Sequence, residues 1–191
     1  MVSENNWRKF KIGVFGSAGG DEMERCRDFA RDVGMAVSKY NGILCTGACP
    51  GLPHEAATGA HDYDNDSLVL GFSPALNQFD HVNNFKFPAD PYILTFTGME
   101  KKGRNLICTR TCHAGIFIAG RWGTVNEFTL MCDEGEGKVI GLLAGSGGFV
   151  DSMIIPGLNQ TDKTTKATIV IEQDPEKLVI GIMSALEKMY Y

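Results

Sequence analysis

The chain has 191 residues, 43% hydrophobic and 21% charged, a balance typical of a globular protein with a substantial core. Its formal charge of −5 argues against a general nucleic-acid binder, and no apolar stretch reaches the ~18 residues that a membrane span needs. The opening MVSENNWRKFK contains no apolar signal core, so we expect a cytoplasmic protein that contacts neither membrane nor nucleic acid.

Short apolar runs alternate with segments of helical periodicity along the chain. We predict strands at 10–16, 42–47, 67–73, 92–96, 114–120, 138–144 and 167–172. We predict helices at 21–40, 52–60, 100–112 and 124–134, a short helix at 149–155, and a final helix that Asp174 caps and Pro175 begins. Strands that are apolar throughout are typical of a parallel sheet covered on both faces. The sequence therefore predicts a single α/β domain over 1–191, a doubly wound, mostly parallel sheet of about seven strands.

Two predicted helices carry a continuous apolar stripe, which we expect to face the core. In the first helix the stripe comprises Met23, Cys26, Phe29, Ala30, Val33, Ala36, Val37 and Tyr40, and in the last it comprises Leu178, Val179, Ile182, Met183 and Leu186.

The six cysteines lie mostly inside apolar elements, and we interpret them as reduced thiols that pack in the core. Cys45 and Cys49, and Cys108 and Cys112 beside His113, leave a metal or thiol site as an alternative. Their CxxxC spacing is not the CxxC of zinc knuckles, so we expect no metal.

Three glycine-rich segments, GSAGGDE (16–22), TGACPGLP (46–53) and AGRWGT (119–124), follow predicted strands and lead toward helices. Ligands of doubly wound sheets bind at the carboxyl ends of the strands, where glycine lets backbone N–H groups approach an anion. The three loops therefore indicate a phosphate-bearing, nucleotide-like ligand. Neither GxGxxG nor GxxxxGK[ST] is present, which argues against a dehydrogenase and against a P-loop NTPase.

GRWGTVNE (120–127) resembles the PGGxGTxxE motif of the LOG family, the phosphoribohydrolases that activate cytokinins and that belong to the SLOG superfamily with a Rossmann-like fold. TGACPGLPHEAATGA is similar to that family's GGGxxGLMxxxAxxA segment, and Arg104 in GRNLI falls where the family has the arginine of RKxxM. The resemblance runs from about residue 10 to 145.

The resemblance implies that Arg104 and Glu127 form the catalytic pair. It also implies, with the glycine loops, a phosphate site that comprises Gly16, Ser17, Gly47, Gly51, Gly120, Arg121, Gly123 and Thr124. A carboxylate suits N-glycosidic hydrolysis because it can activate a water and stabilise an oxocarbenium-like transition state. This activity needs no cofactor, and family members form homodimers or larger homo-oligomers.

The sequence departs from the family motif at three positions. Ala119 replaces the proline, Arg121 replaces the second glycine, and Asn126 replaces an acid. A side chain at 121 either limits the approach of backbone to phosphate, strains the loop if φ is positive, or supplies charge to the phosphate. These departures favour the alternative of a non-catalytic binder or carrier of a phosphorylated nucleotide or molybdopterin-type cofactor.

Other residues of this region allow more than one interpretation. Thr124-x-x-Glu127 also fits a capping box, which would explain the pair without catalysis. Trp122 could stack on a base or cover the loop, and Asp80-His81 lies in a loop where a substrate base could rest. Our leading hypothesis is a LOG-like enzyme that hydrolyses a nucleoside 5′-monophosphate to free base and ribose 5-phosphate.

Overall fold

The computed structural model describes residues 9–133, 137–160 and 165–190. Its strands are β1 (Lys11–Gly16), β2 (Ile43–Thr46), β3 (Val69–Ser73), β4 (Ile93–Phe96), β5 (Ala114–Ile118), β6 (Val139–Leu143) and β7 (Thr168–Glu172). Its helices are α1 (Asp21–Lys39), α2 (Leu52–Tyr63), α3 (Gln78–Asn83), α4 (Glu100–Thr111), α5 (Trp122–Asp133), a π-helical turn η1 (Val150–Ile154), α6 (Ile155–Gln160) and α7 (Pro175–Tyr190). Every predicted element is present, with ends within a few residues of those expected.

All seven strands form one parallel sheet in the order β4-β3-β2-β1-β5-β6-β7. The prediction of a doubly wound Rossmann-like α/β fold is therefore confirmed. Strand order reverses between β1 and β5, because β1 leads toward β2 on one side while the chain returns to β5 on the other. This reversal point is where ligands bind in such sheets.

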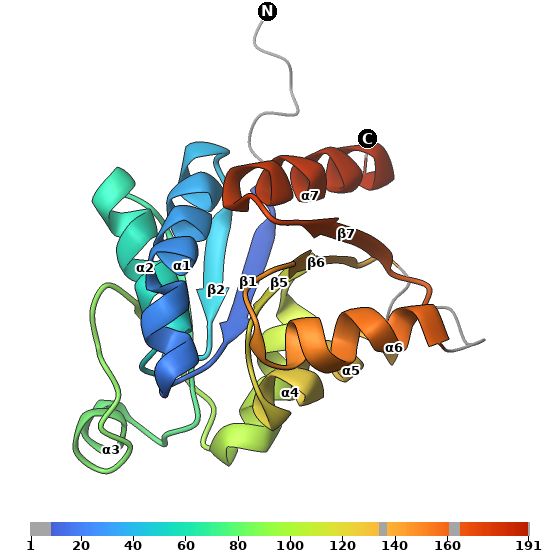
Figure 1. Cartoon of the computed structure of the whole chain (residues 1–191). Helices are drawn as coiled ribbons and strands as arrows, with labels where there is room; N and C mark the ends of the chain where they lie inside the picture. Colours follow the sequence, from blue (N-terminus) through green and yellow to red (C-terminus); the bar gives the residue numbers. More distant parts are fainter. Residues whose placement is uncertain (1–8, 134–136, 161–164, 191) are drawn as a thin grey trace, which may run out of the picture.

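Helices cover both faces of the sheet (Figure 1). On one face α1, α2 and α7 pack with β1 and β2 around a core that includes Ile12, Val33 and Leu178. On the other face α4, α5 and η1 pack around Phe117, Cys108 and Met131. Both cores depend on β5, since its five residues are all buried.

The edge strands differ from the expectation of burial on both faces. Residues of β4 alternate between exposed and partly buried, and Ile93 is 55% exposed. β7 is also largely exposed, whereas β5 and β6 are buried throughout. β4 and β7 are the two edge strands of the sheet. Their apolar composition did not distinguish them from the central strands.

The amphipathic stripes face the core with one exception. Phe29 on α1 is 38% exposed, so its prediction as an inward residue was wrong. On α7, Met183 is only partly buried and packs against the core, while the other four predicted residues are buried. Asp174 accepts a hydrogen bond from Lys177 N (2.9 Å), which confirms the predicted cap.

α1 and α2 approach closely because glycine lies at each crossing point. A Cβ on Gly34 would overlap the carbonyl group of Ala56, and a Cβ on Gly59 would overlap the carbonyl group of Arg31. The two backbones therefore touch where a side chain would separate them, and α2 is held firmly behind the second glycine loop.

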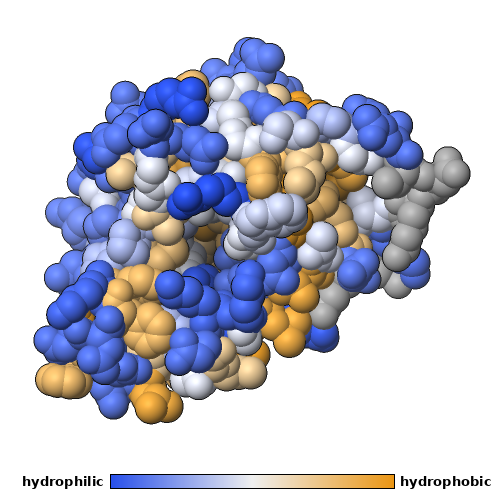
Figure 2. Space-filling model, turned by 60° about the horizontal axis from the view of Figure 1, so that its bottom comes forward, coloured by the Kyte–Doolittle hydropathy of each residue, from blue (hydrophilic) through white to orange (hydrophobic). Residues whose placement is uncertain are grey.

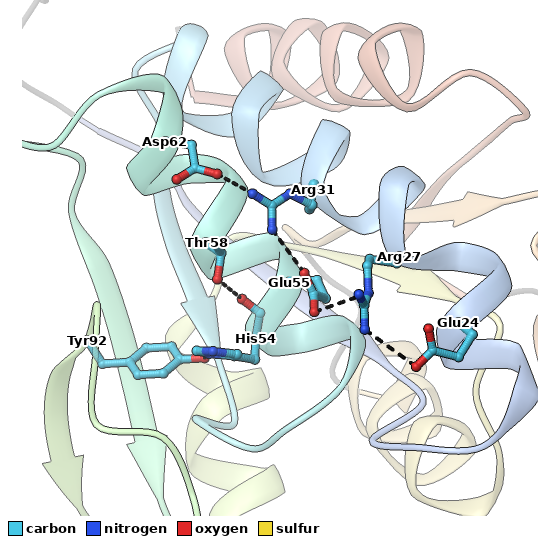
Figure 3. Close-up of polar contacts among 8 residues, drawn as sticks. All are labelled: Glu24, Arg27, Arg31, His54, Glu55, Thr58, Asp62 and Tyr92. Atoms are coloured by element: carbon cyan, nitrogen blue, oxygen red, sulfur yellow. Dashed lines mark hydrogen bonds and ion pairs between the residues drawn. The ribbon is translucent and has the colours of Figure 1, made fainter.

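Ion pairs join the outer faces of the same two helices (Figure 3). Glu55 on α2 lies 3.5 Å from Arg27 Nε and 3.2 Å from Arg31 Nη1, and Arg31 also pairs with Asp62. The Glu55 side chain is 17% exposed, so this carboxylate is the best shielded member of the network. Such pairs add modest stability each, but together they fix the register of α1 against α2.

Among the described residues, no helix combines the length and the apolar character that crossing a membrane requires.

Candidate functional site

A cavity of about 280 Å³ lies at the carboxyl end of the sheet, beside the point where strand order reverses. Figure 2 brings this edge forward, and strongly hydrophilic residues lie above and below a hollow near the middle of the view. The lining residues are Gly16, Ser17, Ala18, Cys49, Phe87, Lys101, Lys102, Arg104, Asn105, Arg121, Gly123, Thr124 and Glu127. A larger, more apolar groove of about 430 Å³ runs between α5 and α6 and contains none of the predicted site residues.

Hydrogen bonds join the three glycine-rich loops around Ser17. Leu52 N, at the start of α2, donates to Ser17 O (2.9 Å), and Gly120 N donates to Ser17 Oγ (3.2 Å). The Arg121 guanidinium donates to Gly19 O (3.3 Å). Loops that are about 100 residues apart in sequence thus form one surface, as expected for successive turns at one edge of a parallel sheet.

Seven of the ten predicted site residues line the cavity: Gly16, Ser17, Arg104, Arg121, Gly123, Thr124 and Glu127. Gly47, Gly51 and Gly120 are not in its wall. Gly47 leaves room for the Arg104 guanidinium, since a Cβ there would lie 2.6 Å from Nη2. Gly51, at φ +84°, lets the second loop pack on Ala18 of the first.

Arg104 and Glu127 meet at the floor of the cavity. Arg104 comes from α4 and Glu127 from α5, and Nη1 lies 3.6 Å from Oε1. The two residues are only 5% and 8% exposed. Burial raises the pKa of Glu127 to about 7, because desolvation of the carboxylate outweighs the opposing attraction of Arg104. Near neutral pH this carboxyl group can therefore both accept and release a proton.

Asn105 gives Glu127 a second partner. With its amide oriented so that the nitrogen faces acceptors, Nδ2 donates to Glu127 Oε1 (3.1 Å) and to Lys101 O (2.9 Å). Asn105 is buried beside Arg104 on the same helix. Glu127 is thus held from two directions by α4, which fixes where its carboxylate faces.

Positive charge predominates around this single carboxylate. Lys101, Lys102, Arg104 and Arg121 all line the cavity, against Glu127 alone. The N-terminus of α5 also borders the cavity, since Gly123 and Thr124 are the second and third residues of that helix and are part of the cavity wall. The first N–H groups of a helix have no partner within the helix and favour an anion. The cavity is therefore suited to a ligand with a multiply charged group such as a phosphate.

The backbone amides of the third loop are less open than the glycine pattern predicted. Ala119 N donates to Ser146 Oγ (2.8 Å), and Gly120 N donates to Ser17 Oγ. Side-chain hydroxyls of the protein thus occupy both N–H groups, and we expected that of Gly120 to face an anion. Side-chain cations and the start of α5 supply most of the positive potential.

The capping-box interpretation of Thr124 and Glu127 is wrong. α5 begins at Trp122, and Val125 N donates to Arg121 O (3.0 Å), so Thr124 lies inside the first helical turn. Thr124 instead packs on the loop, because a Cβ on Gly120 would overlap its side chain. Glu127 is therefore free of a capping role and faces the cavity.

The motif departures have different structural consequences. Ala119 has φ +51°, which a proline ring cannot adopt, so this loop cannot follow the backbone of a PGGxGT motif at that position. Arg121 is not among the residues with positive φ, so its side chain does not strain the loop. Its guanidinium supplies charge at the cavity wall, the third of the outcomes expected for this position.

Three residues singled out in the sequence, Trp122, Asp80 and His81, are not in the wall of the cavity. Trp122 is 67% exposed and packs edge-on against Phe149, with ring centroids 4.9 Å apart, so it covers the loop. Asp80 and His81 were expected in a loop but lie in the short helix α3. His81 is fully buried, and Asp80 Oδ2 accepts from Leu76 N (3.0 Å) in the turn before this helix.

Six lining residues were not among the predicted site residues: Ala18, Cys49, Phe87, Lys101, Lys102 and Asn105. Three of them, Lys101, Lys102 and Asn105, lie within about one turn of Arg104 in the predicted helix. The placement of Arg104 at the site could therefore have predicted that they are close to it. Phe87 had no signal, because it lies in a loop without periodicity.

The cysteines pack as expected from their apolar neighbours. Cys45, Cys108 and Cys112 are buried in the second core, and burial raises the pKa of the Cys49 thiol at the cavity wall. His113 Nδ1 accepts from Lys11 N (2.9 Å), which gives this ring a structural partner. In the described part of the chain, no group of three His, Cys, Asp or Glu side chains is arranged to hold a metal ion.

Comparison with known proteins decides the family, since the SLOG cluster4 family model matches residues 9–179. The chain belongs to the SLOG cluster4 family. This membership confirms the superfamily that the GRWGTVNE motif indicated. An uncharacterized protein of Archaeoglobus fulgidus is 29% identical over 126 residues, which are 66% of this chain and 76% of the relative.

Two solved structures share the fold of this SLOG cluster4 protein. The X-ray structure of TM1055, a structural genomics target, is 21% identical with a TM-score of 0.75, and the match covers 93% of this chain and 99% of that one. The molybdenum cofactor binding protein of the phototrophic bacterium Rippkaea orientalis is 22% identical with a TM-score of 0.70, over 94% of this chain and 99% of that one.

Proposed function

We propose that this protein hydrolyses the N-glycosidic bond of a nucleoside 5′-monophosphate and releases the free base and ribose 5-phosphate. The observation that carries the proposal is Glu127, a buried carboxylate whose pKa is about 7, in the wall of an otherwise cationic cavity. A site that only bound an anion would gain nothing from a carboxylate, which repels the ligand. A carboxylate whose pKa lies near the working pH is well suited to act as the general base for a water.

The lining residues divide the work of this reaction. Lys101, Lys102 and Arg121, with the start of α5, attract the 5′-phosphate and place the ribose over Glu127. The Glu127 carboxylate takes a proton from a water whose oxygen attacks C1′. The C1′–N bond then breaks, its electron pair goes to the base nitrogen, and that nitrogen takes a proton from solvent. In the transition state, while this proton is still being transferred, the Glu127 carboxylate keeps part of its negative charge and stabilises the oxocarbenium-like sugar.

Arg104 and Asn105 act through Glu127. Arg104 keeps part of the carboxylate population ionised despite burial, and Asn105 holds one oxygen so that the other faces the cavity. Both are positioning residues in this mechanism, because each contacts the carboxylate.

The test is to incubate the protein with a panel of nucleoside 5′-monophosphates and to measure released base and ribose 5-phosphate. We expect the rate to rise with pH through about 7, as Glu127 ionises. Glu127→Gln should lower the rate by roughly 100-fold or more. Glu187→Gln, at an exposed site on α7, is the matched control and should keep the parent rate. No base release from any nucleotide by the parent would contradict the proposal.

A second function, a binder or carrier of a phosphorylated nucleotide or molybdopterin-type cofactor, is favoured by the departures at Ala119 and Arg121. The occupied amide of Gly120 also supports it, as does the fold shared with a molybdenum cofactor binding protein. The cationic cavity suits the phosphate of either ligand class. A protein that purifies with a pterin chromophore and releases no base from nucleotides would select this function. Arg121→Ala should then lower the affinity for the ligand several-fold, while Lys177→Ala on α7 leaves it unchanged.

A further inference from the structure

We infer that Phe87 forms the platform on which the planar heterocycle of the ligand stacks, an inference that rests on the proposed function. Phe87 is the one aromatic residue in the described wall of the cavity, and its ring is partly exposed there. Aromatic side chains bind bases through their faces, without a requirement for one particular base.

The sheet places Phe87 and the start of α5, which attracts the phosphate, on opposite sides of the cavity. Phe87 follows α3, in the connection from β3 to β4, whereas Arg121 and Gly123 follow β5. β2 and β1 lie between β3 and β5, so the ends of β3 and β5 are roughly 14 Å apart. A nucleoside 5′-monophosphate also carries its phosphate and its base at opposite ends of the ribose. With the phosphate at α5, the base reaches the Phe87 side and C1′ lies near Glu127.

A buried hydrogen-bond chain fixes the Phe87 ring. His81 is fully buried, and its Nε2 donates to Pro88 O (2.9 Å), which makes Nδ1 the acceptor for the Ser73 hydroxyl (2.8 Å). Phe87 N donates to His81 O (3.1 Å), and the two rings pack edge to face at 5.7 Å. These bonds join the loop to the end of β3 and hold the Phe87 ring in one position.

One face of the Phe87 ring is covered by an exposed lysine of the cavity wall. Lys101 Nζ lies over it at 6.0 Å from the ring centroid, and Lys101 is itself an exposed residue of the cavity wall. A heterocycle that stacks on Phe87 replaces this ammonium, and the long lysine side chain can then turn to the phosphate. The ring is thus covered by a movable cation before the ligand binds.

The test compares two probes by calorimetry in the Glu127→Gln background, where hydrolysis does not intervene. Adenosine 5′-monophosphate carries the heterocycle, and ribose 5-phosphate lacks it. We expect Phe87→Leu and Phe87→Ala to weaken binding of adenosine 5′-monophosphate by roughly tenfold or more, and binding of ribose 5-phosphate by less than twofold. Phe87→Trp should keep the affinity for both probes.

Phe79→Ala is the matched control, since Phe79 is 70% exposed on α3 of the same connection. Phe87→Leu retains apolar bulk against His81, so it separates loss of the ring from collapse of the loop. Equal weakening of both probes by Phe87→Leu, or no weakening of either, would overturn the stacking platform while the proposed function stands. Failure of the Phe87-containing protein to bind adenosine 5′-monophosphate would overturn both.

Discussion

Gly47 and Arg104 are in direct contact across the second glycine loop, and the guanidinium occupies the space where any side chain at position 47 would lie. A Cβ on Gly47 would overlap Nη1 and lie 2.6 Å from Nη2. Gly47 in the TGACPG loop therefore contributes to the site by leaving room for the Arg104 guanidinium, in addition to any effect on backbone conformation.

Gly47→Ala should separate Arg104 from Glu127 and lower activity or ligand affinity by roughly tenfold or more, because the guanidinium must move. The fold should survive, since the arginine side chain can rotate toward the cavity. Gly19→Ala is the matched control, because a Cβ at Gly19 meets no atom within 4 Å. Parent-like kinetics for Gly47→Ala would show that the contact does not position Arg104.

Glu127 should make stability depend on pH. Its pKa rises from 4.5 in the unfolded chain to about 7 in the folded protein, so the folded state binds the proton more tightly. The stability that this group contributes is present below pH 4.5 and is lost as pH rises through 7, an effect of about 3 kcal/mol at most. The free energy of unfolding of Glu127→Gln relative to the parent should therefore increase from pH 5 to pH 8.

Urea unfolding of both proteins at the two pH values measures this difference. The exposed Glu187→Gln variant controls for the loss of one carboxylate. A difference between Glu127→Gln and the parent that stays constant with pH would mean that Glu127 is not buried as described.

Ala119→Pro should destabilise the protein although it restores the residue of the family motif. Proline cannot reach φ +51°, and it lacks the N–H that donates to Ser146 Oγ, so we expect a loss of about 3 kcal/mol or more. Ala119→Gly should lie within about 1 kcal/mol of the parent, since glycine adopts this conformation readily. Thermal unfolding of the two variants checks both expectations, and a stable proline variant would contradict the backbone described for this loop.

Gly34→Ala should force α1 away from α2 and lower the free energy of unfolding by about 3 kcal/mol, because the added methyl overlaps the Ala56 carbonyl. Gly157→Ala in α6 is the control, since open space surrounds that position and alanine favours a helix. Urea unfolding decides the point. Equal stability of Gly34→Ala and the parent would show that the helices can separate freely.

The sequence specified the sheet and its helices because apolar periodicity reflects burial directly. It also indicated that loops after β1, β2 and β5 meet, since parallel strands bring their carboxyl ends to one edge. Arg104 was found only through resemblance, because nothing in its local pattern separates it from an exposed helix residue.

Tertiary contacts decided what the sequence did not predict. His81 lies in the short helix α3 and Phe87 in the loop that follows it. The His81 ring is held by hydrogen bonds to Ser73 and Pro88, which no periodicity encodes. Thr124 was misassigned because the helix starts two residues earlier than its apolar pattern does. The amide of Gly120 was expected to be open, but Ser17 reaches it from a loop 103 residues away.

The hydroxyl of Ser17, between Gly120 N and Glu22 Oε2, determines what an arriving anion gains from this loop. When an anion binds the Gly120 N–H, it replaces the Ser17 hydroxyl as the acceptor. The gain in binding free energy is therefore only the difference between a hydrogen bond to a charged acceptor and one to a neutral acceptor. The empty protein meanwhile has this donor satisfied and needs no rearrangement when the ligand departs. Such a balance suits quick, reversible occupancy, as rapid product release or transfer to another protein would require.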